Sequence, residues 1–248
     1  MNEIFLKLAY LAASVLFILG LRLLSSPRSA PRGNMVSAVG MLIAIVATLM
    51  ANEIVSSAGI VAGLLAGGAI GTVLALRIEM TAMPQLVALF NGLGGGASAL
   101  VAAGELMHPG RSVDTLKAVP VALGILIGAV TLTGSMVAFA KLQGLVPGGA
   151  IRSRLLILIN GVTTLLTLLL CGALVGDPEA LSIAAGLAAV SCVVGVLAVI
   201  SIGGADMPVV IALLNALSGL AASATGFALN NDVLIISGSL VGASGVIL

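Results

Sequence analysis

The sequence predicts an all-α, polytopic bundle of transmembrane helices, and three observations support this fold class. Of the 248 residues, 60% are hydrophobic and only 8% are charged, whereas a soluble domain is typically about 25% charged. The apolar residues form runs long enough to cross a bilayer as helices, which takes roughly 17–25 residues each. None of these runs shows the alternating pattern of a membrane β-strand. This composition excludes a soluble globular enzyme and a disordered chain, and a net charge of +1 gives no reason to expect a nucleic-acid partner.

The apolar runs predict about nine spans, which we treat as a single transmembrane domain over residues 1–248. This prediction places the chain in a lipid bilayer, because in water each run would expose apolar side chains at an unfavourable free-energy cost. In chain order the predicted spans are 4–24, 34–50, 58–76, 84–104, 119–140, 154–175, 180–202, 207–229 and 232–248.

The first spans are bounded by charges and turn residues. Span 4–24 has Lys7 and Arg22 near its ends and lacks the small-residue cleavage site of a secretory signal. We therefore interpret it as a retained helix rather than a cleaved leader. Two turn segments, Ser25-Ser26-Pro27 and Pro31-Arg32-Gly33, are expected to separate it from the second span.

Proline and glycine mark the boundaries of the later spans. Pro84 and Pro208 fall in the first turns of the fourth and eighth spans, where proline is tolerated. His108-Pro109-Gly110 lies in the longest loop, Pro147-Gly148-Gly149 follows the fifth span and Asp177-Pro178 follows the sixth. His108 is the only histidine, and we interpret it as a solvated loop residue.

The basic residues predict an outer N-terminus and an inner C-terminus. With the N-terminus outside, the outer segments carry three basic residues and the inner segments carry seven, as the positive-inside rule requires. The three are Lys7, Arg111 and Lys117, and the seven are Arg22, Arg28, Arg32, Arg77, Lys141, Arg152 and Arg154. The last span stops at Leu248 without a closing polar residue, so we expect the natural chain to continue inside.

An internal repeat relates the fourth span to the eighth. Aligning 83–100 with 207–224 gives eight identities at an offset of 124 residues, including Met-Pro and the asparagine seven residues after each proline. The offset is four helices, an even number, so both copies run in the same direction, as in transporters built on parallel repeats. The alternative is chance similarity between two helices rich in Ala and Leu.

Each repeat places one asparagine inside the membrane. Asn91 and Asn215 lie roughly 10 Å from their helix starts, in a hydrocarbon layer of about 30 Å. One interpretation is an interhelical hydrogen bond, worth about 0.6 kcal/mol on average. The other is a polar step in a proton or ion path, since intramembrane polar groups often mark such routes. The residues leave both interpretations open.

Charged residues are scarce inside the spans. Asp206 directly precedes the Met-Pro pair of the eighth span, and Arg77 and Glu79 flank the inner start of the fourth. Asp206 and Asp232 can be explained as helix caps that the helix dipole favours, although Asp206 also suits an inner-edge role in a proton path. No mid-membrane side chain titrates near neutral pH, so a proton relay would need water or a group from another chain.

Small residues line several spans and predict close helix packing. The ninth span adds Ser237, Ser239 and Ser244, so its Gly/Ser face could border water as well. The glycine stripes are Gly63, Gly67 and Gly71 in the third span, Gly124 and Gly128 in the fifth, and Gly238, Gly242 and Gly245 in the ninth.

Two other features are not interpreted as sites. Cys171 and Cys192 lie in apolar runs and are expected to be small buried hydrophobic residues, neither a disulfide nor metal ligands. The stretch from Gly92 to Ala97 matches GxGxxA, but it lies within an apolar helix rather than between a strand and a helix. We therefore expect no metal site, and no nucleotide cofactor bound by this segment.

Five motifs resemble the membrane domain of the proton-translocating NAD(P) transhydrogenase β subunit. The resemblance covers essentially the whole chain. The motifs are Glu79-Met-Thr-x-Met-Pro84, Gly128-Ala-Val-Thr-x-Thr-Gly-Ser135, Ser201-Ile-Gly-Gly-Ala-Asp206-Met-Pro-Val-Val, Leu214-Asn215-x-x-Ser218-Gly219, and Asn231-Asp232-x-Leu-Ile-x-x-Gly238-x-Leu-Val-Gly242-x-Ser-Gly245.

The resemblance implies an enzyme complex that couples hydride transfer between NAD(H) and NADP(H) to proton movement across a bacterial inner membrane. It implies nine β-subunit helices followed by a cytosolic NADP(H) domain, an α subunit with its own helices and the NAD(H) domain, and a dimer of such assemblies. No hydride-transfer site belongs to this segment. Asp206 and Asn215 resemble positions tied to proton translocation, and Ser237 and Ser244 join them as expected path residues. The face of Gly238, Gly242 and Gly245 resembles the helix that links channel to nucleotide domain.

The sequence departs from the family pattern at three positions. Many members carry a histidine at the position of Asn91, and members often carry acids at the positions of Ala82 and Gln85. Our hypothesis is that a histidine on an α-subunit helix reaches the depth of Asn91 and Asn215. The alternative function is a secondary transporter with parallel repeats, in which the two asparagines line a substrate site. A scaffold bundle without transport is a third, less favoured reading.

Overall fold

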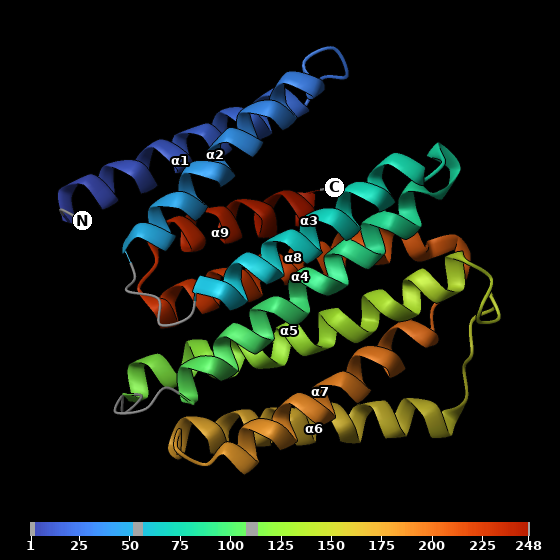
Figure 1. Cartoon of the computed structure of the whole chain (residues 1–248). Coiled ribbons are helices and arrows are strands. Elements are labelled where there is room, and N and C mark those ends of the chain that lie inside the picture. The colour runs from blue at the N-terminus through green and yellow to red at the C-terminus, as the bar shows by residue number, and fades with distance from the viewer. Residues whose placement is uncertain (1–2, 52–56, 108–113, 248) are drawn as a thin grey trace. The chain divides into compact units, whose positions relative to one another are not determined.

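The computed structural model describes residues 3–51, 57–107 and 114–247. Over these ranges the chain forms nine α-helices and two short 3₁₀ turns, with no strand (Figure 1). Eight of the helices are long and apolar enough to cross a membrane, and the ninth, α9 (Asp232–Ile247), has 16 residues. The described residues therefore confirm the all-α, polytopic fold class. His108 and Arg111 lie outside the described residues.

The helices group into two compact units, residues 1–78 and 79–248. Unit 1 contains α1 (Glu3–Leu24), α2 (Ala30–Ala51) and α3 (Ser57–Arg77). The helices α1 and α2 pack against each other, and a hydrogen bond of 2.9 Å joins the Tyr10 and Thr48 hydroxyl oxygens across them. The expected second turn at Pro31 is wrong, because Pro31 lies in the first turn of α2, where the missing N–H of proline costs no helical hydrogen bond.

The glycine stripe of α3 does not pack as predicted. A Cβ placed on Gly63, Gly67 or Gly71 would meet no atom within 4 Å among the described residues of unit 1. Small residues permit two helices to approach closely, but they do not themselves supply a partner.

Unit 2 contains six helices arranged around α5 (Thr115–Leu142). This helix contacts α4 (Met83–Leu106), α6 (Arg154–Gly176), α7 (Leu181–Ile200) and α8 (Met207–Leu229). Ala, Val and Leu side chains fill the space around it, and Val121, Ala122 and Ile125 of α5 are at most 1% exposed. The turn sequences at 147–149 and 177–178 connect α5 to α6 and α6 to α7, as predicted.

The internal repeat is also a structural repeat. The 3₁₀ turns η1 (Met80–Ala82) and η2 (Gly204–Asp206) precede α4 and α8 at positions 124 residues apart, and each helix has a proline in its first turn. Each copy then pairs with the next helix, α4 with α5 and α8 with α9 (Figure 1). We call the end where α4 and α8 begin the Asp206 end, and the opposite end the Glu105 end.

Equivalent glycines lie at the crossing point of each helix pair. A Cβ on Gly95 would lie 2.9 Å from the Gly128 carbonyl oxygen of α5, and a Cβ on Gly219 would lie 2.6 Å from the Gly238 carbonyl oxygen of α9. Such distances leave no room for a side chain. The two hairpins are therefore held at backbone contact by glycines at the same repeat position.

Candidate functional site

A polar cluster around Asn91 joins three helices of unit 2. The Asn91 side chain is 9% exposed, and its Nδ2 donates a hydrogen bond of 2.9 Å to Oγ of Ser135 on α5. Ser135 itself is fully buried. From α8, the Ser218 hydroxyl donates to the Asn91 carbonyl oxygen at 3.3 Å. Because these groups lie among apolar helices, each is paired where water is excluded.

Glycine permits the close approach of α5 to Asn91. A Cβ on Gly92 would lie 2.5 Å from Cε of Met136 and 3.1 Å from Cβ of Ser135. A side chain at this position would displace the Met136 methyl and press on Ser135, the hydrogen-bond partner of Asn91. The glycine next to Asn91 thus contributes to the site by its lack of a side chain.

Asn215, the repeat partner of Asn91, has different surroundings. It is half-buried, and its amide forms no hydrogen bond among the described residues. An amide can both donate and accept hydrogen bonds, so the Asn215 side chain has donors and an acceptor that remain available in the membrane. The interhelical bond that one interpretation expected is thus present at Asn91, whereas it is absent at Asn215 within the described part of the chain.

The helices α4 and α8 run parallel along this site. The Thr225 hydroxyl is within 3.3 Å of the Ser98 carbonyl oxygen, seven residues further along both helices than the contact of Ser218 with Asn91. Thr225 also donates to its own helix at the Ala221 oxygen, 2.8 Å away. Both contacts join residues 127 apart, so α8 is shifted by three residues relative to the repeat offset of 124.

A line of polar residues extends from Asn91 toward the Glu105 end. Asn91, Ser98 and Glu105 are spaced by seven residues on α4 and so share one face. Glu105 is 5% exposed, and Thr131 of α5 is fully buried with no hydrogen bond to its Oγ1 among the described residues. Sequence reasoning missed Ser98, Glu105, Thr131 and Thr225. The seven-residue spacing on α4 was a signal that could have found two of them.

At the opposite end, Asp206 is exposed at the N-cap position of α8. Its carboxylate forms no capping hydrogen bond there, so only the helix dipole favours it at this position. Asp232 lies in the first turn of α9, where the dipole also favours an acid, and the capping hydrogen bond comes from Asn231, which accepts from the Leu234 N–H at 3.0 Å. Glu79 is exposed and accepts a hydrogen bond from Thr81 at 3.5 Å.

Residues 6–248 match the family model of the NAD(P) transhydrogenase beta subunit. The chain belongs to this family. It is 44% identical over 247 residues to two sequences of Rhodospirillum rubrum that are both named NAD(P) transhydrogenase subunit beta. Each alignment covers 97% of this chain and 53% of the relative, so the chain spans about half the length of the curated relatives it matches.

In this transhydrogenase β-subunit chain, the glycine face of α9 is packed against α8. Gly238, Gly242 and Gly245 are buried, and a Cβ on Gly245 would lie 2.8 Å from the Ala216 nitrogen. The structure does not bring Ser237 or Ser244 into the Asn91 cluster by hydrogen bonds, because their hydroxyls donate to the Leu234 and Val241 carbonyl oxygens of their own helix.

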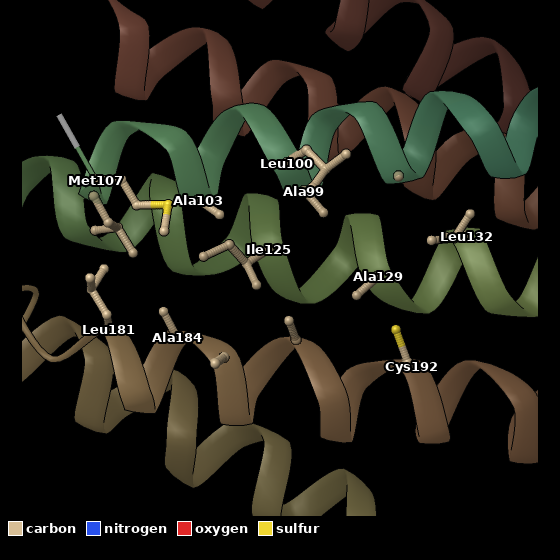
Figure 2. A pocket seen from close by; sticks show the side chains of 14 residues that line it. Ala99, Leu100, Ala103, Met107, Ile125, Ala129, Leu132, Leu181, Ala184 and Cys192 are labelled. Atoms are coloured by element: carbon tan, nitrogen blue, oxygen red, sulfur yellow. The ribbon is translucent and has the colours of Figure 1, made fainter.

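One cavity in the described part of the β-subunit chain is apolar and distinct from the polar cluster. It has a volume of 360 Å³ and lies between α4, α5 and α7. Figure 2 shows Ala103, Ile125 and Cys192 among the side chains that line it. With no polar side chain except the thiol in its lining, this cavity offers no hydrogen-bonded route for a proton.

Neither cysteine of the β-subunit chain is fully buried. Cys171 and Cys192 are both free and partly exposed, which corrects the expectation of buried cysteines. Cys171 packs against the core of unit 2 and Cys192 lines the cavity, and in both places a thiol behaves as a small hydrophobic group. Within the described ranges, no group of three His, Cys, Asp or Glu residues is placed to hold a metal ion.

The glycine-rich stretch of α4 does not have the geometry of a dinucleotide fingerprint. The GxGxxA stretch from Gly92 to Ala97 is helical within α4, and Gly92 and Gly95 are buried against α5. A dinucleotide fingerprint instead needs a turn between strand and helix, with free backbone N–H groups facing a pyrophosphate.

Proposed function

We propose that this chain is the proton-conducting membrane domain of an NAD(P) transhydrogenase. The observation that carries this function is the buried Asn91 cluster at the junction of the two repeat helices and α5. The cluster places polar atoms deep in the membrane-spanning helices. Polar residues are rare there, and they often mark ion or proton pathways. The position of the cluster between two repeats related by parallel packing supports a route across the membrane.

The proton path in this proposal runs from Asp206 past Asn215 and Asn91. Asp206 is exposed and acts as the entry group at the inner side, and Glu79 contributes a charge at the same end of unit 2. Ser237 and Ser244 line the path only when their hydroxyls turn away from their own helix. Asn91 is anchored to Ser135, while Asn215 is free to bind water or a partner side chain.

Proton movement requires a group that titrates, and the amides of Asn91 and Asn215 do not. We therefore propose that an α-subunit helix places a histidine beside them. Protonation then shifts the relative stability of two states of the attached NADP(H) domain, which couples proton binding to nucleotide binding. The glycine face of α9 transmits this change to the segment that follows it.

The remaining parts of the assembly follow from the same proposal. NADP(H) binds to a cytosolic domain of the whole β subunit, NAD(H) binds to the α subunit, and the complex works as a dimer in a bacterial inner membrane. The N-terminus faces outward and the Asp206 end faces inward, as the positive charges predict. The secondary-transporter alternative is not favoured, because the family match covers nearly the whole chain.

The test uses the complete transhydrogenase in sealed vesicles containing a pH-sensitive dye. Replacement Asn91→Leu should abolish proton movement driven by hydride transfer, while Asn160→Leu should leave it intact. Asn160 is a suitable control because it is an asparagine in the N-terminal half of another long apolar helix, as the seventh residue of α6. Equal proton movement in both variants contradicts the proposal, and loss in Asn91→Leu alone supports it.

A further inference from the structure

Lys141, in the last turn of α5, is a buried cation at the Asp206 end of unit 2. Its side chain is 5% exposed. The ammonium donates hydrogen bonds to the carbonyl oxygens of Ile202 at 2.6 Å, Ile200 at 2.7 Å and Gly149 at 3.3 Å. An ammonium has three N–H groups, so all of its donors are engaged. Within the described part of the chain, no carboxylate forms an ion pair with it.

The carbonyl groups that bind Lys141 lie where a cation is favoured. Ile200 is the last residue of α7, and Ile202 follows directly after the helix cap at Ser201. The final carbonyl groups of a helix lack partners within the helix and carry the negative end of its dipole. Lys141 therefore caps α7 from a neighbouring helix.

Two more hydrogen bonds join the same segments. The Gly204 N–H donates to the Gly148 carbonyl oxygen at 2.7 Å, and Nε of Arg152 is 3.4 Å from the Ser201 carbonyl oxygen. The loop after α5 and the turn after α7 are therefore connected at several points. Asp206 ends the 3₁₀ turn that this network holds.

Burying an ammonium is costly, but an apolar residue at this position would leave several carbonyl oxygens without a donor. Two of the three hydrogen bonds of Lys141, those to Ile200 and Ile202, are made to the segment that leads to Asp206. Ser135, the partner of Asn91, lies six residues earlier on the same helix, about 9 Å away along its axis.

We infer that Lys141 is a positioning residue of the proton path, acting through residues 200–204 to hold Asp206 at a fixed distance from the Asn91 cluster. This inference rests on the proposed function, because it assigns Lys141 a role toward Asp206. Lys141 itself does not carry the proton, since its three donors are bound to carbonyl oxygens. Its role is to fix the position of Asp206, the proposed entry group.

The first measurement asks whether Lys141 holds the turn. In the purified complete transhydrogenase, with Cys171 and Cys192 replaced by alanine, Met207→Cys reports on the turn through its rate of reaction with a water-soluble maleimide, because Met207 directly follows Asp206 and is fully buried. The same enzyme without Met207→Cys gives the background rate. Lys141→Met should raise the rate about tenfold, equal to about 1.4 kcal/mol in the opening equilibrium.

Matched variants separate the position from the residue type. Lys7→Met is the control, because Lys7 is exposed and pairs with Glu3 on its own helix. It should leave the labelling rate unchanged. Lys141→Arg keeps the charge and donors and should give a rate near the native one. If Lys141→Met does not assemble, Lys141→Gln removes the charge and gives the same comparison.

The second measurement asks whether the turn matters through Asp206. The number of protons moved per hydride is compared for Lys141→Met, Asp206→Asn and the double variant in sealed vesicles. Lys141→Met should add no further loss to Asp206→Asn, because both act on one group. An unchanged labelling rate, or losses that simply add, overturns the inference. A native proton ratio in Asp206→Asn contradicts the proposed function instead, whatever the labelling shows.

Discussion

Asn91 donates a hydrogen bond of 2.9 Å to Ser135 across the interface of α4 and α5. Both residues are buried, and the close approach of the helices at Gly92 makes the contact possible. The pair fixes the orientation of the amide at a depth where water is scarce. Several expectations depend on this orientation and on the residues around it.

Ser135→Ala should lower proton-coupled hydride transfer far more than it lowers stability. The lost bond is worth about 0.6 kcal/mol on average in a membrane protein, so the complex should still assemble. The freed amide should reorient, and coupled turnover should fall roughly tenfold, which corresponds to about 1.4 kcal/mol. Vesicle proton uptake and thermal stability are measured together, and Ser14→Ala is the control, because Ser14 is a buried serine whose hydroxyl donates to the Tyr10 carbonyl oxygen of its own helix. A drop in stability without loss of coupling would show a purely structural contact.

Asn215→Asp should disturb coupling without disturbing packing. The native amide has no hydrogen bond among the described residues, so the near-isosteric change breaks no contact in this part of the chain. It does introduce a group that ionises, and a charge in the membrane alters the path. Proton movement per hydride is the readout, with Asn215→Leu as the uncharged comparison. If all three proteins move protons equally, Asn215 lies outside the path.

Gly219→Ala should destabilise the complex, because a Cβ there would lie 2.6 Å from the Gly238 oxygen. Forcing atoms into a packed contact costs about 1–3 kcal/mol. The temperature at which the solubilised complex loses its monodisperse peak should fall accordingly. Gly104→Ala, where a Cβ meets nothing within 4 Å, should leave that temperature unchanged or raise it. Equal temperatures for both variants would show that α8 and α9 separate easily.

Glu105→Gln should slow proton-coupled turnover if the polar face of α4 continues the path to the Glu105 end. The substitution keeps the size of a side chain that is 5% exposed and removes its ability to ionise. We expect a reduction of roughly fivefold, about 1 kcal/mol. Glu179→Gln, an exposed acid at the same end of unit 2, should have no effect. Identical rates in the two variants would show that the path does not include Glu105.

The sequence predicted the helices and the repeat because both leave strong linear signals. Long apolar runs have few alternatives to membrane helices, and the proline-to-asparagine spacing recurs in a single register. The partners of Asn91 were not predictable, since apolar periodicity does not tell which face of α5 meets α4. Lys141 was counted as a loop charge because its sequence position at a helix end does not reveal that three carbonyl groups surround it.

The glycine motifs also show that the sequence does not reveal which helix a surface will contact. Gly63, Gly67 and Gly71 have the spacing of Gly238, Gly242 and Gly245 over their first two members, yet the α3 stripe meets no atom in its own unit while the α9 glycines touch α8. A glycine motif shows that one helix surface permits close approach, but it does not identify the helix that approaches. The partner is set by chain connectivity, which places α9 directly after α8.

The three-residue shift between α4 and α8 gives the two copies of the repeat unequal tasks. A shift of three residues moves one helix about 4.5 Å along the other, so Ser218 rather than Asn215 lies against Asn91. One amide is thereby locked in place and its counterpart left unattached. The two halves are alike in sequence but not interchangeable in structure, so in the path that we propose Asn91 would be the fixed polar group and Asn215 the one that is open to a partner.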